Sequence, residues 1–255
     1  MPDQRSRTGA QAIERALGVL RCFESATDLG ITEIARRTGL SISTAHRVTK
    51  ALTEGGLLTQ DPKTERYQLG PTLVVLGNKA ARGLGYDPAL PSLRALSTDT
   101  GESVNLGIRA GTDVQVVLDV ASAQPLRFAQ QPGTRVPLHT SAMGKCLLAF
   151  AGDIEAEIAE LGELPPITEK TITDPAELAD ELRRVRERGW ALNDEERHAG
   201  VRTVAVPVLS SDGGVVAAIA VQGPTVRITD EKISELTERL RVAAEEVGPL
   251  LLATR

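Results

Sequence analysis

Two short helical patterns lie between residues 31 and 58, joined by only three or four residues, and this feature constrains the fold most. In the first pattern Thr32 is the expected N-cap and Gly39 the expected end. Ser41 is the expected N-cap of the second pattern, because its hydroxyl can accept a hydrogen bond from a free amide of the next turn. Two helices with so short a connection are typical of a helix-turn-helix unit.

The segments on either side of this pair fit a larger motif. Before it, apolar residues fall on one helical stripe that could cover the pair, namely Ile13, Leu17, Leu20 and Phe23. After it, residues 55–70 contain two short extended runs around Asp-Pro-Lys-Thr, which predicts a hairpin. Helices followed by a hairpin in this order indicate a winged helix-turn-helix, whose second helix of the pair enters the major groove of DNA.

One face of that second helix has no apolar residue. Ala45, Val48 and Leu52 share the other side of the helical wheel. The polar face has cations, hydroxyls and an imidazole but no carboxylate, whereas an ordinary solvated face mixes both charges. The residues that we predict to contact DNA from this helix are Ser41, Ser43, Thr44, His46, Arg47 and Lys50. For His46, a surface imidazole at the edge of the interface is an equally good interpretation.

The formal charge of −5 is unevenly distributed along the chain. Residues 1–82 contain twelve Lys/Arg and eight Asp/Glu, a net of +4, and the remainder has 17 basic and 26 acidic residues, a net of −9. A basic front on an acidic body directs a polyanion to one end of the molecule. We therefore expect phosphate contacts from the N-terminal arm and the hairpin, at Arg5, Arg7, Lys63 and Arg66. For each of these residues alone, a solvated surface charge is an equally good interpretation.

Composition excludes several other classes of protein. A chain of 255 residues with 41% hydrophobic and 25% charged residues is long enough for two globular domains. No apolar run is long enough to span a bilayer and no signal peptide is evident, so we expect a cytoplasmic protein without a membrane partner. Cys22 and Cys146 are too few for a disulfide framework or a zinc site, and the three histidines lack ligand spacing. We expect no metal site.

After the hairpin, residues 71–85 form an expected linker helix, whose apolar stripe predicts that Leu73 and Leu76 are buried between subunits. Beyond it the pattern changes to extended runs at VNLGI, VQVVLDV, PLRFAQ, WALND, TVAVPVLS and VVAAIAVQG. Helical segments interleave with them at SAMGKCLLAFA, DPAELADELRRVRERG and TDEKISELTERLRVAAEEVG. A Ser-Asp-Gly-Gly hairpin between the last two runs favours antiparallel pairing, so we expect a mainly antiparallel sheet with flanking helices, as in small-molecule sensor domains.

The segment RVPLHTSAMGKCLLAF could bind an anion. A strand ends there and a helix begins at Thr140 or Ser141, and small residues leave the first-turn amides reachable. From this segment alone, a simple capped turn is the better interpretation. No catalytic residues are expected, because Ser141 and Lys145 lack the spacing of a serine–lysine nucleophile and His139 has no evident orienting carboxylate.

These segments together resemble the IclR family of bacterial transcription regulators over nearly the whole chain. The most specific matches are LHTSAMGKCLLA, GWALNDEERHAGVRTVAVPV and VVAAIAVQGP, in that order. The resemblance implies an α+β fold: a winged helix-turn-helix in residues 1–70, a linker helix in 71–85, and a GAF/PAS-like effector-binding domain with a mainly antiparallel sheet and flanking helices in 86–255.

The resemblance also implies a pocket for a small organic acid, with no other cofactor. Ala142 and Met143 would offer backbone amides to the carboxylate, and other residues would line the rest: Phe128, Val136, Asn193, Thr203, Ala220 and Gln222. Asn193 stands where members often have Asp, and Thr203 where Cys is common, which leaves the ligand's identity open. Phe128 beside Val136 would suit an aromatic or branched acid.

The implied function is a DNA-binding repressor of a catabolic operon, acting on double-stranded operator DNA as a homodimer or a dimer of dimers. Two-fold symmetry is physically sensible, because one recognition helix contacts few base pairs. The residues do not distinguish a repressor from an activator. An enzyme with a DNA-tethering domain and an architectural protein that binds no small molecule are the alternatives.

Overall fold

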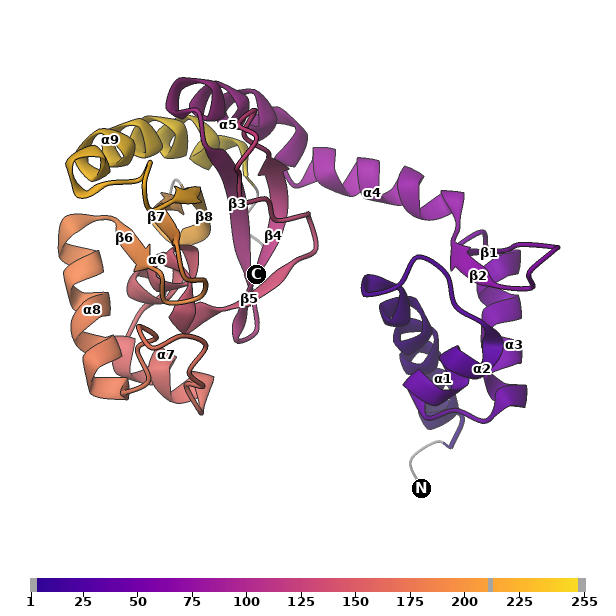
Figure 1. The fold of residues 1–255 in the computed structure, drawn as a ribbon. Helices are drawn as coiled ribbons and strands as arrows, with labels where there is room; N and C mark the ends of the chain where they lie inside the picture. Colours follow the sequence, from indigo (N-terminus) through magenta and orange to yellow (C-terminus); the bar gives the residue numbers. More distant parts are fainter. Residues whose placement is uncertain (1–3, 211–212, 252–255) are drawn as a thin grey trace. The chain divides into compact units, whose positions relative to one another are not determined.

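The computed structural model describes residues 4–210 and 213–251, and of residues 4–8 the backbone alone. The chain divides into two compact units, Met1–Ala80 and Ala81–Arg255. The division falls within helix α4 (Pro71–Gly83), the segment in which we expected a linker helix (Figure 1). Among the described helices, none combines the length and the apolar character needed to cross a membrane.

The first unit is a winged helix-turn-helix. Its helices are α1 (Gln4–Arg21), η1 (Cys22–Glu24), α2 (Ile31–Thr38) and α3 (Ile42–Glu54), followed by the antiparallel hairpin of β1 (Leu58–Gln60) and β2 (Tyr67–Leu69). Gly39 ends α2 in the left-handed conformation and the Ser41 hydroxyl caps α3, as predicted. The N-cap of α2 is Gly30 rather than Thr32, because the Glu33 carboxylate already accepts the Gly30 amide at 2.8 Å.

The core of the first unit lies between the last turns of α1, the helix pair and the hairpin. Val19, Phe23 and Ile34 are among its buried residues. The expectation that the whole stripe of α1 covers the pair is wrong, since Ile13 and Leu17 are 64% and 48% exposed. The stripe continues along α1 beyond the part of the core that this helix contacts.

The second unit is built on one six-stranded sheet of order β5-β4-β3-β8-β7-β6, in which every neighbouring pair is antiparallel. The strands are β3 (Ser103–Ala110), β4 (Asp113–Val120), β5 (Arg135–Pro137), β6 (Ala191–Asp194), β7 (Val201–Leu209) and β8 (Val215–Pro224). The expected strand PLRFAQ is wrong: residues 125–130 have no regular structure, and β5 follows them instead. The prolines at positions 125 and 132 flank this loop and interrupt strand pairing.

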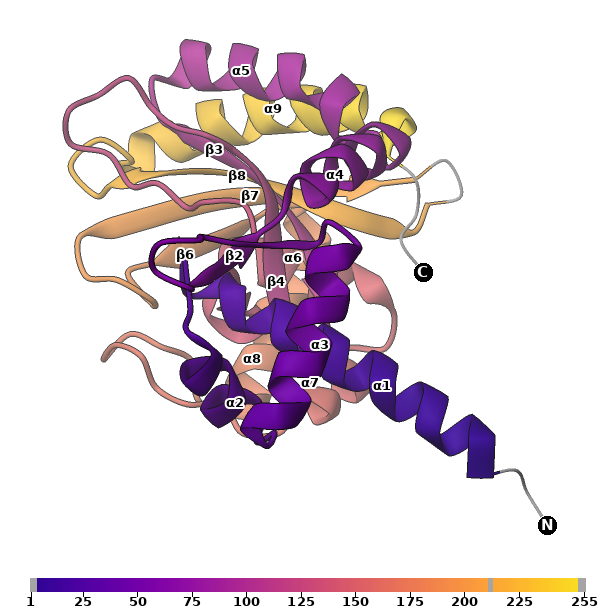
Figure 2. The same ribbon diagram turned by 90° about the vertical axis from the view of Figure 1, so that its right-hand side faces the viewer.

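Helices cover both faces of this sheet (Figures 1 and 2). One face packs on α5 (Tyr86–Thr100) and α9 (Asp230–Val247), and the other on α6 (Ala142–Ala151), against which α8 (Pro175–Arg188) and α7 (Ile154–Leu161) pack. The α+β class with flanking helices is therefore confirmed. Helices α5 and α7 were not expected from the sequence: Pro91 interrupts the helical pattern of the first, and the second has only eight residues.

The two faces of the central strands carry side chains of different size. Alternate residues of β7 and β8 place Val206 and Ile219 against α5 and α9, and place Ala205, Ala218 and Ala220 against α6. Alanines let α6 lie close to the sheet. The face that carries these alanines also carries polar residues. Asn105 of β3 lies opposite Ala220, and Thr203 of β7 lies opposite Gln222 of β8.

Candidate functional sites

The α3 face, formed by Ser43, His46, Arg47 and Lys50, is exposed as predicted. On the opposite side Ala45 and Thr49 are buried, together with Leu52, so the helix presents one polar face to solvent. Lys50 makes an ion pair with Glu54 at 3.9 Å, in which both side chains are 68% exposed. Such an exposed pair is weak and yields easily to a phosphate.

The N-cap of α3 already uses some of its hydroxyl groups. Ser41 Oγ accepts the Thr44 amide at 3.3 Å and donates to Thr44 Oγ1 at 2.9 Å. Ser43 Oγ lies 3.1 Å from Ser41 Oγ, at the exposed start of the helix. The first turn therefore presents a small cluster of hydroxyls whose positions are fixed by capping.

The hairpin differs from expectation at Arg66. Its guanidinium pairs with Asp28 and with Glu33, the latter at 2.9 Å, and thereby ties the hairpin to the start of α2. Arg66 is therefore already paired, although its side chain is 39% exposed, and a contact with phosphate would compete with these two carboxylates. Lys63 lies exposed in the turn. Arg5 and Arg7 lie in the first turns of α1, and their side chains fall outside the described residues.

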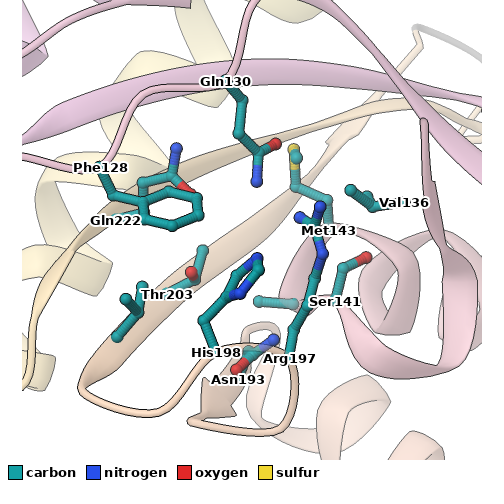
Figure 3. A pocket seen from close by; sticks show the side chains of 12 residues that line it. Phe128, Gln130, Val136, Ser141, Met143, Asn193, Arg197, His198, Thr203 and Gln222 are labelled. Atoms are coloured by element: carbon teal, nitrogen blue, oxygen red, sulfur yellow. The ribbon is translucent and has the colours of Figure 1, made fainter. Parts of the chain in front are cut away.

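The second unit contains a pocket at the N-terminus of α6, here termed the α6 pocket (Figure 3). It has an empty volume of about 380 Å³, part of which is open to solvent. Its lining comes from β5 and the loop before it, from the start of α6, from β6, β7 and β8, and from the segment between β6 and β7. The lining residues are Phe128, Gln130, Val136, Ser141, Ala142, Met143, Asn193, Arg197, His198, Val201, Thr203 and Gln222.

The first turn of α6 lines this pocket. Ser141 caps the helix by accepting the Gly144 amide at 2.9 Å. The amides of Ala142 and Met143, at the first two helical positions, have no acceptor within the helix. Gly144 is required here, because a Cβ atom would lie 2.1 Å from the carbonyl oxygen of Leu138. The close approach of this turn to the preceding 3-10 helix η2 (Leu138–Thr140) fixes where the free amides point.

Hydrogen bonds fix the polar residues on the sheet side of the pocket. Gln222 donates from Nε2 to Asn105, whose own Nδ2 donates to Asp119 at 2.7 Å. Asn193 donates to the carbonyl of Thr140. Of the predicted effector-binding residues, Ala220 is not part of this lining: it is fully buried among the residues that pack against α6.

A buried ion pair holds the segment between β6 and β7 against α6. Lys145 Nζ lies 2.5 Å from Glu196 Oε1, with side chains 2% and 8% exposed, and also donates to the carbonyl of Leu192 at 3.1 Å. Burial raises the pKa of Glu196, and the charge of Lys145 opposes this shift. The pair positions the two residues that follow Glu196, namely Arg197 and His198.

Sequence reasoning missed five lining residues: Gln130, Ser141 (predicted only as a cap), Arg197, His198 and Val201. Gln130, Arg197 and His198 lie on loops without hydrophobic periodicity, so no pattern indicated which way they point. Over the part of the chain that the structure describes, no group of three or more His, Cys, Asp or Glu side chains could hold a metal ion.

Comparison with known families accounts for both units. Residues 12–62 match the model of the IclR helix-turn-helix domain, and residues 86–248 match the model described as Bacterial transcriptional regulator IclR C-terminal. The first match lies within the winged helix-turn-helix, and the second covers most of the unit that contains the α6 pocket.

Individual relatives agree with these matches. The HTH-type transcriptional regulator BhcR of Paracoccus denitrificans is 38% identical, over 94% of this chain and 87% of the relative. The Acetate operon repressor of Salmonella typhimurium is 30% identical, over 93% and 88%. An IclR homolog from Microbacterium hydrocarbonoxydans, solved in complex with 4-hydroxybenzoate, has a TM-score of 0.83 at 25% identity, over 93% of this chain and 97% of that one. By these matches over both of its units, the chain belongs to the IclR family of bacterial transcriptional regulators.

Proposed function

We propose that this protein represses a catabolic operon and that a small organic acid in the α6 pocket controls its affinity for operator DNA. The α3 face would enter the major groove, and Lys63 of the hairpin would contact phosphate. The proposal includes no catalytic step and places the protein in the cytoplasm. A relative named as an operon repressor supports repression rather than activation.

The observation that carries the ligand proposal is the chemistry of the pocket lining. The lining residues include an arginine and the free amides of the α6 N-terminus, and they include no aspartate or glutamate. Hydrogen-bond donors and a helix N-terminus favour an anion over a cation or a neutral ligand. The solved homologue that holds 4-hydroxybenzoate, a carboxylate, supports the same class of ligand.

Calorimetry with metabolic acids and their amides tests the anchor. Met143→Pro deletes one of the donor amides while proline remains tolerable in a first helical turn, so it should weaken binding of every acid. Met143→Ala keeps the amide and should change which acids fit more than whether an acid binds. Amides that bind as well as acids, or normal binding by Met143→Pro, would show that the carboxylate anchor lies elsewhere.

We also propose that α4 carries a dimer interface. Val74, Val75 and Leu76 are 64%, 56% and 52% exposed in the single chain, and Leu73 is half-buried. Exposed apolar side chains on one helix favour contact with a partner. Dimers would align two α3 faces with two half-sites, and pairing of dimers would give tetramers.

Sedimentation of two matched variants tests this interface. Leu76→Arg should yield monomers with poor operator affinity, because a charge would be buried at the interface. Asn78→Arg adds the same charge to an exposed position of α4 on the side of the helix opposite Leu73 and Leu76, and should leave the assembly unchanged if those two leucines form the interface. An unchanged assembly of Leu76→Arg would place the interface on another surface.

A further inference from the structure

The segment between β6 and β7 contains one cation that lacks a partner. The neighbouring charges are all paired: Asp194 with Arg202, Glu195 with Lys170, and Glu196 with Lys145. Within the described residues, Arg197 makes neither a hydrogen bond nor an ion pair. Burial lowers the pKa of its guanidinium and no carboxylate opposes this shift, yet an arginine stays protonated at pH 7.

Arg197 extends from the segment between β6 and β7 into the α6 pocket. Figure 3 shows its guanidinium beside Ser141 and Met143, at the N-terminus of α6. A partly desolvated charge without a counter-ion is unfavourable, so this position is stabilised when an anion binds. The guanidinium and the first turn of α6 thus line the same pocket from two different elements.

Gln130 presents a second unsatisfied group on the opposite wall. The residue is only 8% exposed, and its Oε1 atom is buried without a hydrogen-bond partner among the described residues. Its side chain points into the pocket (Figure 3). An amide oxygen accepts hydrogen bonds, so the missing partner is a donor such as a hydroxyl group.

Apolar groups and rings enclose the remaining space. Val136, Met143 and Val201 line it, and the rings of Phe128 and His198 meet with centroids 5.0 Å apart. Burial and the neighbouring Arg197 both lower the pKa of His198, so the imidazole is neutral at pH 7. Arg197 is therefore the one charged side chain among the described residues that line the pocket.

We infer that the effector is a small hydroxy acid whose carboxylate binds between Arg197 and the amides of Ala142 and Met143, and whose hydroxyl donates to Gln130. This inference rests on the proposed function and specifies the ligand of the same pocket. Arg197 selects acids over neutral analogues, and Gln130 selects hydroxylated acids over their parents. Each residue therefore controls a different half of the recognition.

Calorimetry on the full-length protein separates the two roles. The probes are three pairs of acids that differ by one hydroxyl: propionate and lactate, butyrate and 3-hydroxybutyrate, benzoate and 4-hydroxybenzoate. In the pair whose size fits the pocket, the hydroxy acid should bind about tenfold more tightly than the acid without the hydroxyl group. Arg197→Met should weaken both members of that pair by roughly 10- to 100-fold. Gln130→Leu should remove the preference for the hydroxy acid and leave the affinity for the parent acid nearly unchanged.

Two further variants control for folding and for net charge. Arg197→Lys keeps the charge and should retain the preference for acids over amides. Arg94→Met removes an exposed arginine from α5, outside the pocket lining, and should bind as the wild type does. Equal affinity of Arg197→Met and the wild type for the acids, or a Gln130→Leu protein that still prefers the hydroxy acid, would overturn the inference and leave the proposed function standing. A wild type that binds none of the six acids would overturn both.

Discussion

We propose an anionic ligand for both the α3 face and the α6 pocket, but the two sites are built in different ways. The α3 face comes from one continuous helix, and its exposed side chains would bind by electrostatics in water. The α6 pocket comes from separate loops, a helix start and four strands, and its donors are partly removed from water. The same class of contact should therefore have a larger energetic effect in the pocket, where the effective dielectric constant is lower.

The largest difference should appear in stability, between two lysines placed on helices of the two regions. Lys145→Met leaves Glu196 buried without its counter-ion and should cost about 3 kcal/mol in the free energy of unfolding. Lys50→Met removes an exposed pair and should cost less than about 0.5 kcal/mol. Denaturant unfolding measures both, followed by circular dichroism and, for the second unit, by the fluorescence of Trp190. Equal costs for the two variants would remove the contrast between the regions.

The next effect concerns sequence discrimination by the α3 face. Arg47→Ala should cost roughly 1–3 kcal/mol on the operator and flatten the preference between operator variants, because base-edge contacts carry sequence information. Fluorescence anisotropy with an operator selected from a random DNA pool measures both quantities. An Arg47→Ala protein with full affinity and full discrimination would show that α3 is not the recognition helix.

The smallest effect distinguishes two cations of the hairpin. Lys63→Ala should reduce the salt slope of DNA binding by about one unit, because an exposed lysine can displace counterions from phosphate. Arg66→Ala should change the slope less and lower stability instead, since Arg66 already pairs with Asp28 and Glu33. Equal slope changes for both variants would mean that Arg66 leaves its partners when DNA binds.

The same contrast explains what could be predicted from the sequence. Features that depend on a few neighbouring residues were predicted correctly. These are the helix caps at Ser41 and Ser141, the helix end at Gly39 and the hairpin around residues 61–64. The exposed α3 face followed from helical periodicity alone. By contrast, Arg197 and Gln130 lie 67 positions apart on irregular loops, and only the tertiary structure brings them to one pocket. Ala220 is buried outside the lining, and its position in the sequence did not indicate how deep it lies on β8.

The central claim is that an acid bound at the α6 N-terminus controls operator binding by α3. Its most direct test is a titration of the protein–operator complex with the tightest-binding acid, comparing the wild type with Met143→Pro. The wild type should release the operator over the concentration range in which the acid binds, whereas Met143→Pro should bind the operator normally and keep it at every acid concentration. Operator affinity that stays constant in the wild type while the acid saturates the pocket, or equal release by both proteins, would contradict the account.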